Sequence, residues 1–167
     1  PFSKGAILGD RIRYSEHFLD PQVFIRSLAT RGSLGGLSSG AFLMARAFDV
    51  CGFDICLIET VGVGQSELDV LHVADQIAVV LVPESGDSIQ AMKAGLMEIA
   101  DLFVVNKGDR PGADGLVREI EAAIHDGESA RSPSVIKCVS TEGKGIEELA
   151  QKILVARKTN VLANRIS

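Results

Sequence analysis

The second part of the chain alternates between short apolar runs and longer amphipathic segments. Four runs rich in β-branched residues lie at 54–59, 76–82, 102–106 and 134–139. Three of them are apolar on both faces, which is typical of strands that helices cover on both sides. Helical patterns occupy the segments at 65–73, 88–100, 113–125 and 145–156. This alternation predicts an α/β fold, a mainly parallel sheet flanked by helices, with ligands at the carboxyl ends of the strands.

The first part of the chain is less regular. Glycines interrupt residues 1–36, although the pattern allows a helix at 10–19 and an extended segment at 23–28. A clearer helix is predicted at 38–50, where Ser38 or Ser39 can cap the first turn and apolar residues recur at helical spacing.

Composition and charge narrow the class of protein. With 167 residues, 46% of them hydrophobic, the chain can form one domain with a buried core. A net charge of −5 argues against a nucleic-acid binder, and the longest clear apolar run, 77–83, is too short to span a membrane. The three cysteines contain no CxxC pair, which supports neither a disulfide framework nor a zinc site. A reducing, cytoplasmic location fits best.

The most specific chemical signal follows the third apolar run. Asn106-Lys107-Gly108-Asp109 matches the NKxD pattern of GTP-binding proteins. In that pattern the Asp carboxylate accepts two hydrogen bonds from the guanine edge, whereas adenine would leave the carboxylate unpaired. The Asn ties neighbouring loops together, and the Lys stem packs on the base. Position at the end of an apolar strand favours the guanine interpretation over a chance match.

An acidic residue and a glycine follow the first apolar run. Glu59 ends this run and Gly62 comes three residues later, the spacing of a nucleotide-phosphate site with Mg²⁺. The carboxylate could hold the hydrated metal or orient a water, and Gly62 could bring its N–H close to a terminal phosphate. A polar strand end with a flexible glycine turn explains these residues equally well.

Three other loops carry weaker signals. Val139 and Ser140 fall where GTPases have an SA-type loop whose backbone contacts guanine O6, although the match is poor. The loop after the second run leads into a helix with Asp87, Gln90 and Lys93, which local chemistry alone explains as a helix cap and solvated side chains. Near the N-terminus, residues 9–13 contain one acidic and two basic residues. The acidic residue could be a second ligand of Mg²⁺ or of a water, but such a cluster is more often a solvated surface.

Five blocks of sequence, in order along nearly the whole chain, resemble the MeaB/ArgK family of P-loop GTPases. The blocks are Gly5–Arg13, Phe24–Gly32, Glu59–Glu67, Ile89–Gly95 and Val104–Asp114. The family includes metallochaperones of adenosylcobalamin-dependent methylmalonyl-CoA mutase, and some members were labelled transport ATPases or kinases for basic amino acids. The resemblance implies a SIMIBI-type P-loop NTPase G domain that hydrolyses GTP to GDP and phosphate with Mg²⁺.

The resemblance also implies a role for each candidate residue. Asp10 and Glu59 would lie at the Mg²⁺ and attacking water, and residues 59–67, with Gly62 and Gln65, would form switch II. The remaining assignments are Arg13 in a switch I region at 1–36, Asp87, Gln90 and Lys93 in switch III, and Asn106, Lys107 and Asp109 at guanine. The mutase would be the partner, and the intact protein would be a homodimer that binds neither nucleic acid nor membrane.

Two features of the family have no counterpart in the printed sequence. The chain has no GxxGxGK[ST] motif, so we expect an N-terminally truncated G domain that opens just after the P-loop region and is inactive alone. We expect an α/β core at 37–156 and the start of a C-terminal extension at 157–167. Two alternatives remain, a non-catalytic module that binds the mutase and an ATP-dependent kinase linked to basic amino-acid transport, against which NKxD argues.

Overall fold

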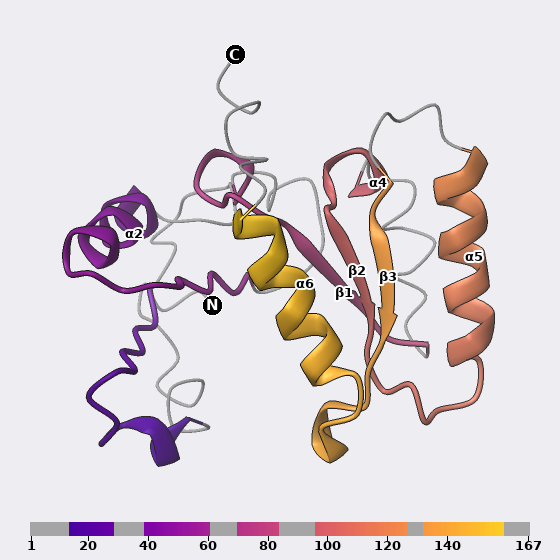
Figure 1. Cartoon of the computed structure of the whole chain (residues 1–167), viewed down its shortest axis with the longest axis horizontal. Coiled ribbons are helices and arrows are strands. Elements are labelled where there is room, and N and C mark those ends of the chain that lie inside the picture. The colour runs from indigo at the N-terminus through magenta and orange to yellow at the C-terminus, as the bar shows by residue number, and fades with distance from the viewer. Residues whose placement is uncertain (1–13, 29–38, 61–69, 84–95, 127–131, 159–167) are drawn as a thin grey trace, which may run out of the picture. The chain divides into compact units, whose positions relative to one another are not determined.

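The computed structural model describes residues 14–28, 39–60, 70–83, 96–126 and 132–158. The chain divides into two compact units, residues 1–73 and 74–167, and each is described by itself (Figure 1). Among the described residues, no helix has both the length and the apolar content needed to cross a lipid bilayer.

The second unit is built on a three-stranded parallel sheet. Its strands are β1 (Ala78–Leu81), β2 (Leu102–Val105) and β3 (Ser134–Lys137), in the order β1-β2-β3. The register is even, because Leu81 pairs with Val105 and Val105 with Lys137, so all three strands end at the same level. The structure thus confirms the predicted α/β class and the strands expected in the last three apolar runs.

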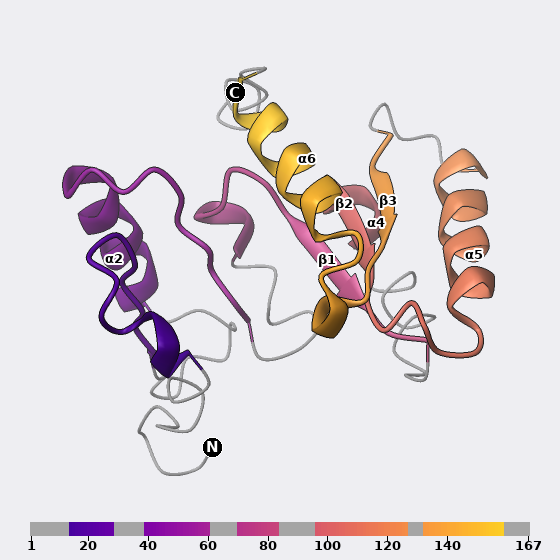
Figure 2. The same ribbon diagram turned by 60° about the horizontal axis from the view of Figure 1, so that its bottom comes forward.

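Helices cover both faces of this sheet. The helices of the unit are α4 (Leu96–Ile99), α5 (Ala113–Asp126) and α6 (Ile146–Lys158). In Figure 2, α5 and α6 lie on opposite sides of the strands. Leu102, Val104, Ile136 and Cys138 form a buried cluster on one face, and Leu149 and Ile153 of α6 pack against it.

The opposite face of the sheet is equally apolar. Phe103 and Val105 alternate with the cluster residues along β2 and are buried, and Ile120 is completely buried on α5, which contacts β2 and β3. Each large apolar side chain buried in this way contributes about 1.5–3 kcal/mol. β2 is therefore the buried central strand, and the residues that follow it start from a firmly held position.

The first unit contains a short 3-10 helix, η1 (Ser15–His17), and the predicted α2 (Ser39–Val50). Phe48 of α2 makes edge-to-face contacts with Phe24 and Phe53, with ring centroids 5.4 and 5.3 Å apart. The segment at 23–28 thus packs on α2 through its phenylalanine. It has no regular secondary structure.

Two predicted elements differ in the structure. The run at 54–59 was expected to form a strand but has no regular secondary structure. A strand requires a neighbour to complete its hydrogen bonds, and none pairs with this run within the described ranges. Accordingly, Leu57 is 82% exposed. The helix expected at 10–19 is only η1 where it is described. η1 buries no residue and Leu19 is 95% exposed, so this segment lacks the packing that stabilises a longer helix.

Two further helical predictions are only partly described. In the segment at 65–73, the structure describes a 3-10 turn at 70–72. In the segment at 88–100, it describes α4. β3 ends at Lys137, earlier than the apolar run does, because Val139 turns away and forms an isolated antiparallel bridge with Lys144.

Candidate functional site

The Asn106–Asp109 segment forms a tight turn at the carboxyl end of β2. The Asn106 N–H continues the sheet by donating to the Leu81 carbonyl at 2.9 Å. Lys107 then adopts a left-handed conformation, with φ of 56°, and the Gly108 N–H donates to the Cys138 carbonyl at 2.8 Å. A left-handed lysine is uncommon, so the hydrogen bonds on both sides must hold it there. The turn is thereby fixed to β1 on one side and to the chain after β3 on the other.

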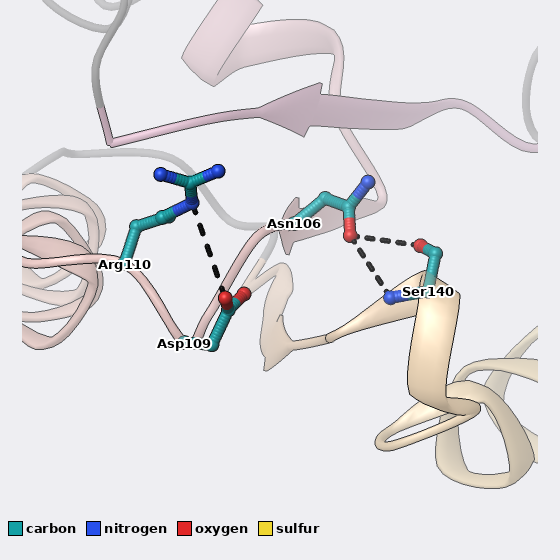
Figure 3. A network of polar contacts seen from close by, with 4 residues as sticks. All are labelled: Asn106, Asp109, Arg110 and Ser140. Atoms are coloured by element: carbon teal, nitrogen blue, oxygen red, sulfur yellow. Dashed lines mark hydrogen bonds and ion pairs between the residues drawn. The ribbon is translucent and has the colours of Figure 1, made fainter.

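Asn106 joins the loop after β2 to the loop after β3. Its Oδ1 accepts two hydrogen bonds from Ser140, one from the backbone N–H at 3.2 Å and one from the hydroxyl at 2.8 Å (Figure 3). Since Oδ1 is the acceptor, the amide nitrogen is directed away from Ser140, as Figure 3 shows. This pair of hydrogen bonds joins, at one edge of the sheet, two segments that are 34 residues apart in sequence.

Asp109 presents an accessible carboxylate beside this junction. Its side chain is 51% exposed and forms an ion pair with Arg110, whose Nε lies 3.9 Å from Oδ2 (Figure 3). Within the described ranges the carboxylate accepts no hydrogen bond. Two carboxylate oxygens on a rigid turn can accept two parallel N–H donors, which is the pattern that the guanine edge offers.

The loop after β3 offers a backbone donor that the sequence pattern did not identify. The sequence placed the guanine O6 contact at Val139 and Ser140. However, the Val139 N–H donates to the Lys144 carbonyl at 3.0 Å, and the Ser140 N–H donates to Asn106. The next N–H, that of exposed Thr141, has no partner among the described residues. Thr141 is therefore the better candidate donor, one residue beyond the predicted pair.

Two charged residues and a glycine complete the loop after β3. Lys144 Nζ lies 2.6 Å from Glu142 Oε2, and this hydrogen bond raises the pKa of Lys144, with a smaller contribution from the charge of Asp109. Gly145 has a φ of +77°, and a Cβ there would overlap the Lys137 carbonyl oxygen, so only glycine fits.

The other predicted residues are placed as follows. Lys107 is exposed at the turn, and Glu59 belongs to the first unit, where it is exposed and has no hydrogen bond or ion pair with a described residue. The candidates outside the described residues are Asp10, Arg13, Gly62, Gln65, Asp87, Gln90 and Lys93. Among the residues that the structure describes, no group of three or more His, Cys, Asp or Glu side chains could hold a metal ion. The described site is therefore the pair of loops after β2 and β3.

Comparison with known proteins identifies the family. The family described as methylmalonyl Co-A mutase-associated GTPase MeaB matches residues 1–165. The chain is 50% identical over 164 residues to a protein of Pyrococcus horikoshii named "Putative GTPase", covering 95% of the chain and 51% of that protein. It is 36% identical over 160 residues to "GTPase ArgK" of Escherichia coli, covering 92% of the chain and 48% of the relative.

A third relative comes from an animal. The "Methylmalonic aciduria type A homolog, mitochondrial" of Caenorhabditis elegans is 44% identical over 105 residues, which cover 63% of the chain and 26% of that protein. The chain spans about half the length of the Pyrococcus and Escherichia relatives. Because the family match extends over almost the whole chain, the chain belongs to the MeaB family of GTPases and shares its P-loop NTPase fold class.

Proposed function

We propose that this MeaB-family chain is the guanine-recognising part of an enzyme that hydrolyses GTP to GDP and phosphate and serves an adenosylcobalamin-dependent mutase of the methylmalonyl-CoA type. One observation carries the proposal. Asn106 holds the loops after β2 and β3 together, which leaves the Asp109 carboxylate and the Thr141 N–H without hydrogen-bond partners among the described residues. A carboxylate and an N–H on adjacent loops form the complement of a guanine edge.

The chemistry of the base distinguishes guanine from adenine at such a site. Guanine has two adjacent donors, N1–H and the 2-amino group, for Asp109, and an acceptor, O6, for Thr141. Adenine has no such donor pair, and its 6-amino group would meet the Thr141 N–H donor to donor. The aliphatic stem of exposed Lys107 is available to pack on the base. The site then selects guanine because another base would leave the Asp109 carboxylate and the Thr141 N–H without hydrogen-bond partners.

Phosphate and metal binding would involve residues mostly outside the described ranges. Mg²⁺ typically binds through one or two carboxylates together with substrate phosphates and water, so a cage of several protein ligands is not required. The exposed Glu59 carboxylate fits that role, with Asp10 as the second acid and Gly62 at the terminal phosphate. Bound Mg²⁺ would neutralise charge that develops on the phosphates during transfer.

The mutase partnership rests on family membership and on a relative. The family description names methylmalonyl-CoA mutase, and the printed name of the Caenorhabditis elegans relative refers to methylmalonic aciduria. We propose that Arg13, Gln65, Asp87, Gln90 and Lys93 are switch residues that respond to the nucleotide and pass its state to the mutase. A homodimer and a cytoplasmic location are part of the same proposal.

Base selectivity tests the proposed function. In the full-length protein, we expect binding of GTP and GDP, much weaker binding of ATP, and Mg²⁺-dependent hydrolysis of GTP. Asp109→Asn exchanges a carboxylate for an amide and should favour xanthosine triphosphate, whose N1 and C2 edge pairs with an amide instead. Two hydrogen bonds to a charged group contribute about 3 kcal/mol when, as here, half the side chain is exposed, which predicts a loss of GTP affinity of about 100-fold.

A matched control makes this experiment specific. Asp126→Asn makes the same chemical change at the exposed end of α5 and should leave nucleotide preference unaltered. Unchanged GTP affinity in Asp109→Asn would refute the assignment of guanine recognition to this turn. Equal binding of ATP and GTP by the unmodified protein would refute guanine selectivity altogether.

A further inference from the structure

Lys137, at the end of β3, lies directly under the Asn106–Asp109 turn. It pairs in register with Val105, the last residue of β2, so its side chain projects from the same face of the sheet, toward α5. Its ammonium lies 2.6 Å from the carboxylate of Asp114, in the first turn of α5. Its stem passes so close to Gly108 that a Cβ on this glycine would lie 2.6 Å from Lys137 Cγ and 3.2 Å from Cδ.

We propose that Lys137 is a positioning residue for guanine recognition: its aliphatic stem, held in place by Asp114, supports the turn that carries Asp109. The proposal rests on the proposed function. The Gly108 N–H is bonded to the Cys138 carbonyl, and Cys138 follows Lys137 directly, so the turn is held against β3 by its backbone and by this side chain together. Neither Lys137 nor Asp114 touches the base; they act through the turn.

The tight approach explains why the turn carries glycine at this position. Any other residue would place its Cβ on the Lys137 stem and 3.0 Å from the Cys138 carbonyl oxygen. The stem is held at its other end, where its ammonium contacts Asp114. Lys137 and Gly108 are therefore coupled, and the coupling is what distinguishes a support from an ordinary surface ion pair, which contributes little.

The competing view is that Lys137 is a solvated side chain that merely meets Asp114. In that case, the stem would swing away from an added methyl group at no cost, and the ion pair could be removed without effect on the turn. Four variants separate the two views: Gly108→Ala, Lys137→Ala, the double variant, and Lys137→Met, which keeps the stem and loses the charge. The readouts are the Kd for GDP, the preference for guanine over xanthine nucleotides, and kcat at saturating GTP.

If Lys137 is a support, Gly108→Ala weakens GDP binding by about 10-fold, a typical effect of one damaging substitution. The double variant regains most of this loss and binds within about 3-fold of Lys137→Ala, because Lys137 Cγ and Cδ are gone. The remaining difference reflects the Cys138 carbonyl oxygen, which still lies 3.0 Å from the new Cβ. Lys137→Met binds GDP more tightly than Lys137→Ala. In these variants the effect on nucleotide binding appears in Kd and KM and not in kcat at saturating GTP. The reason is that the turn contacts the base and not the phosphates.

Each result decides the matter. Wild-type affinity in Gly108→Ala, or a double variant that binds as poorly as Gly108→Ala, overturns the support role while guanine binding by the unmodified protein still stands. If the unmodified protein binds no guanine nucleotide, the proposed function fails and the positioning role fails with it. Urea unfolding of the same four variants identifies a general loss of fold, because such a loss would lower kcat and the unfolding midpoint together.

Discussion

The hydrogen bonds between Asn106 and Ser140 provide a direct test of how the two loops are held together. Asn106→Ala removes the single oxygen that accepts both the Ser140 N–H at 3.2 Å and its hydroxyl at 2.8 Å. Ser140→Ala removes only the hydroxyl contact. Asn106→Asp keeps an oxygen acceptor at the same place. Asn106→Ala therefore loses two hydrogen bonds, Ser140→Ala loses one, and Asn106→Asp loses none.

The expected cost follows from the exposure of the contact. A neutral intramolecular hydrogen bond contributes about 0.5–1.5 kcal/mol net, and loss of a partner is more costly when the remaining group is buried. Ser140 is exposed, so water can satisfy its N–H and hydroxyl, which places each bond at the lower end of this range. We expect Asn106→Ala to lower the free energy of unfolding by about 1–2 kcal/mol and Ser140→Ala by about 0.5–1 kcal/mol.

The measurement is a double-mutant cycle on urea unfolding of the nucleotide-free, full-length protein, with the Kd for GDP measured on the same variants. Because Asn106→Ala already removes the hydroxyl contact, adding Ser140→Ala should cost almost nothing more, which gives a coupling of about 0.5–1 kcal/mol. GDP affinity should fall with Asn106→Ala and be largely kept in Asn106→Asp. Effects that add within about 0.3 kcal/mol would show that the two side chains do not interact, and the junction of the loops would be refuted.

Three other outcomes are expected. Gly145→Ala should unfold at a urea concentration well below that of Gly143→Ala, since a Cβ overlaps backbone at the first and meets nothing within 4 Å at the second, although both have positive φ. The hydrogen bond from Lys137 lowers the pKa of Asp114 from its ordinary 3.8, so the pair stabilises the fold at neutral pH and this stability is lost as pH falls through the lowered pKa. In urea unfolding measured against pH, Asp114→Asn should remove this part of the acid sensitivity. Burial raises the pKa of the Cys138 thiol, so mass spectrometry after brief alkylation should find exposed Cys51 modified and Cys138 intact until urea unfolds the protein.

The secondary structure that follows from local pattern was largely predictable from the sequence. The strands at 78–81, 102–105 and 134–137 lie inside predicted apolar runs, and α5 and α6 match predicted helices to within two residues at each end. Strands and helices can both be predicted from the hydrophobic periodicity of their own residues. The run at 54–59 has the same apolar character, yet a strand also depends on a neighbour, which the composition of a run does not specify.

The candidate site was predictable in its motif but not in its contacts. The NKxD spacing placed Asn106 and Asp109 at a strand end, and the structure has them there. The sequence did not reveal that the Val139 and Ser140 N–H groups are already used, because those partners, Lys144 and Asn106, become known only when the register of the sheet is known. The two glycines of Gly143-Lys144-Gly145 were the available signal of a tightly turned loop.

The parallel register explains why the site forms at this edge. β2 and β3 end side by side, so the chain leaves both strands at the same level and in the same direction. Asn106 comes directly after β2, whereas Ser140 comes three residues after β3, and the turn closed by the Val139–Lys144 bridge returns Ser140 to the level of Asn106. The backbone register thus brings the two loops within reach of each other, and the hydrogen bonds between Asn106 and Ser140 hold them together. Inserting one residue between Val139 and Ser140 would move Ser140 off Asn106 without changing any functional side chain, and guanine binding should then be lost while the sheet remains intact.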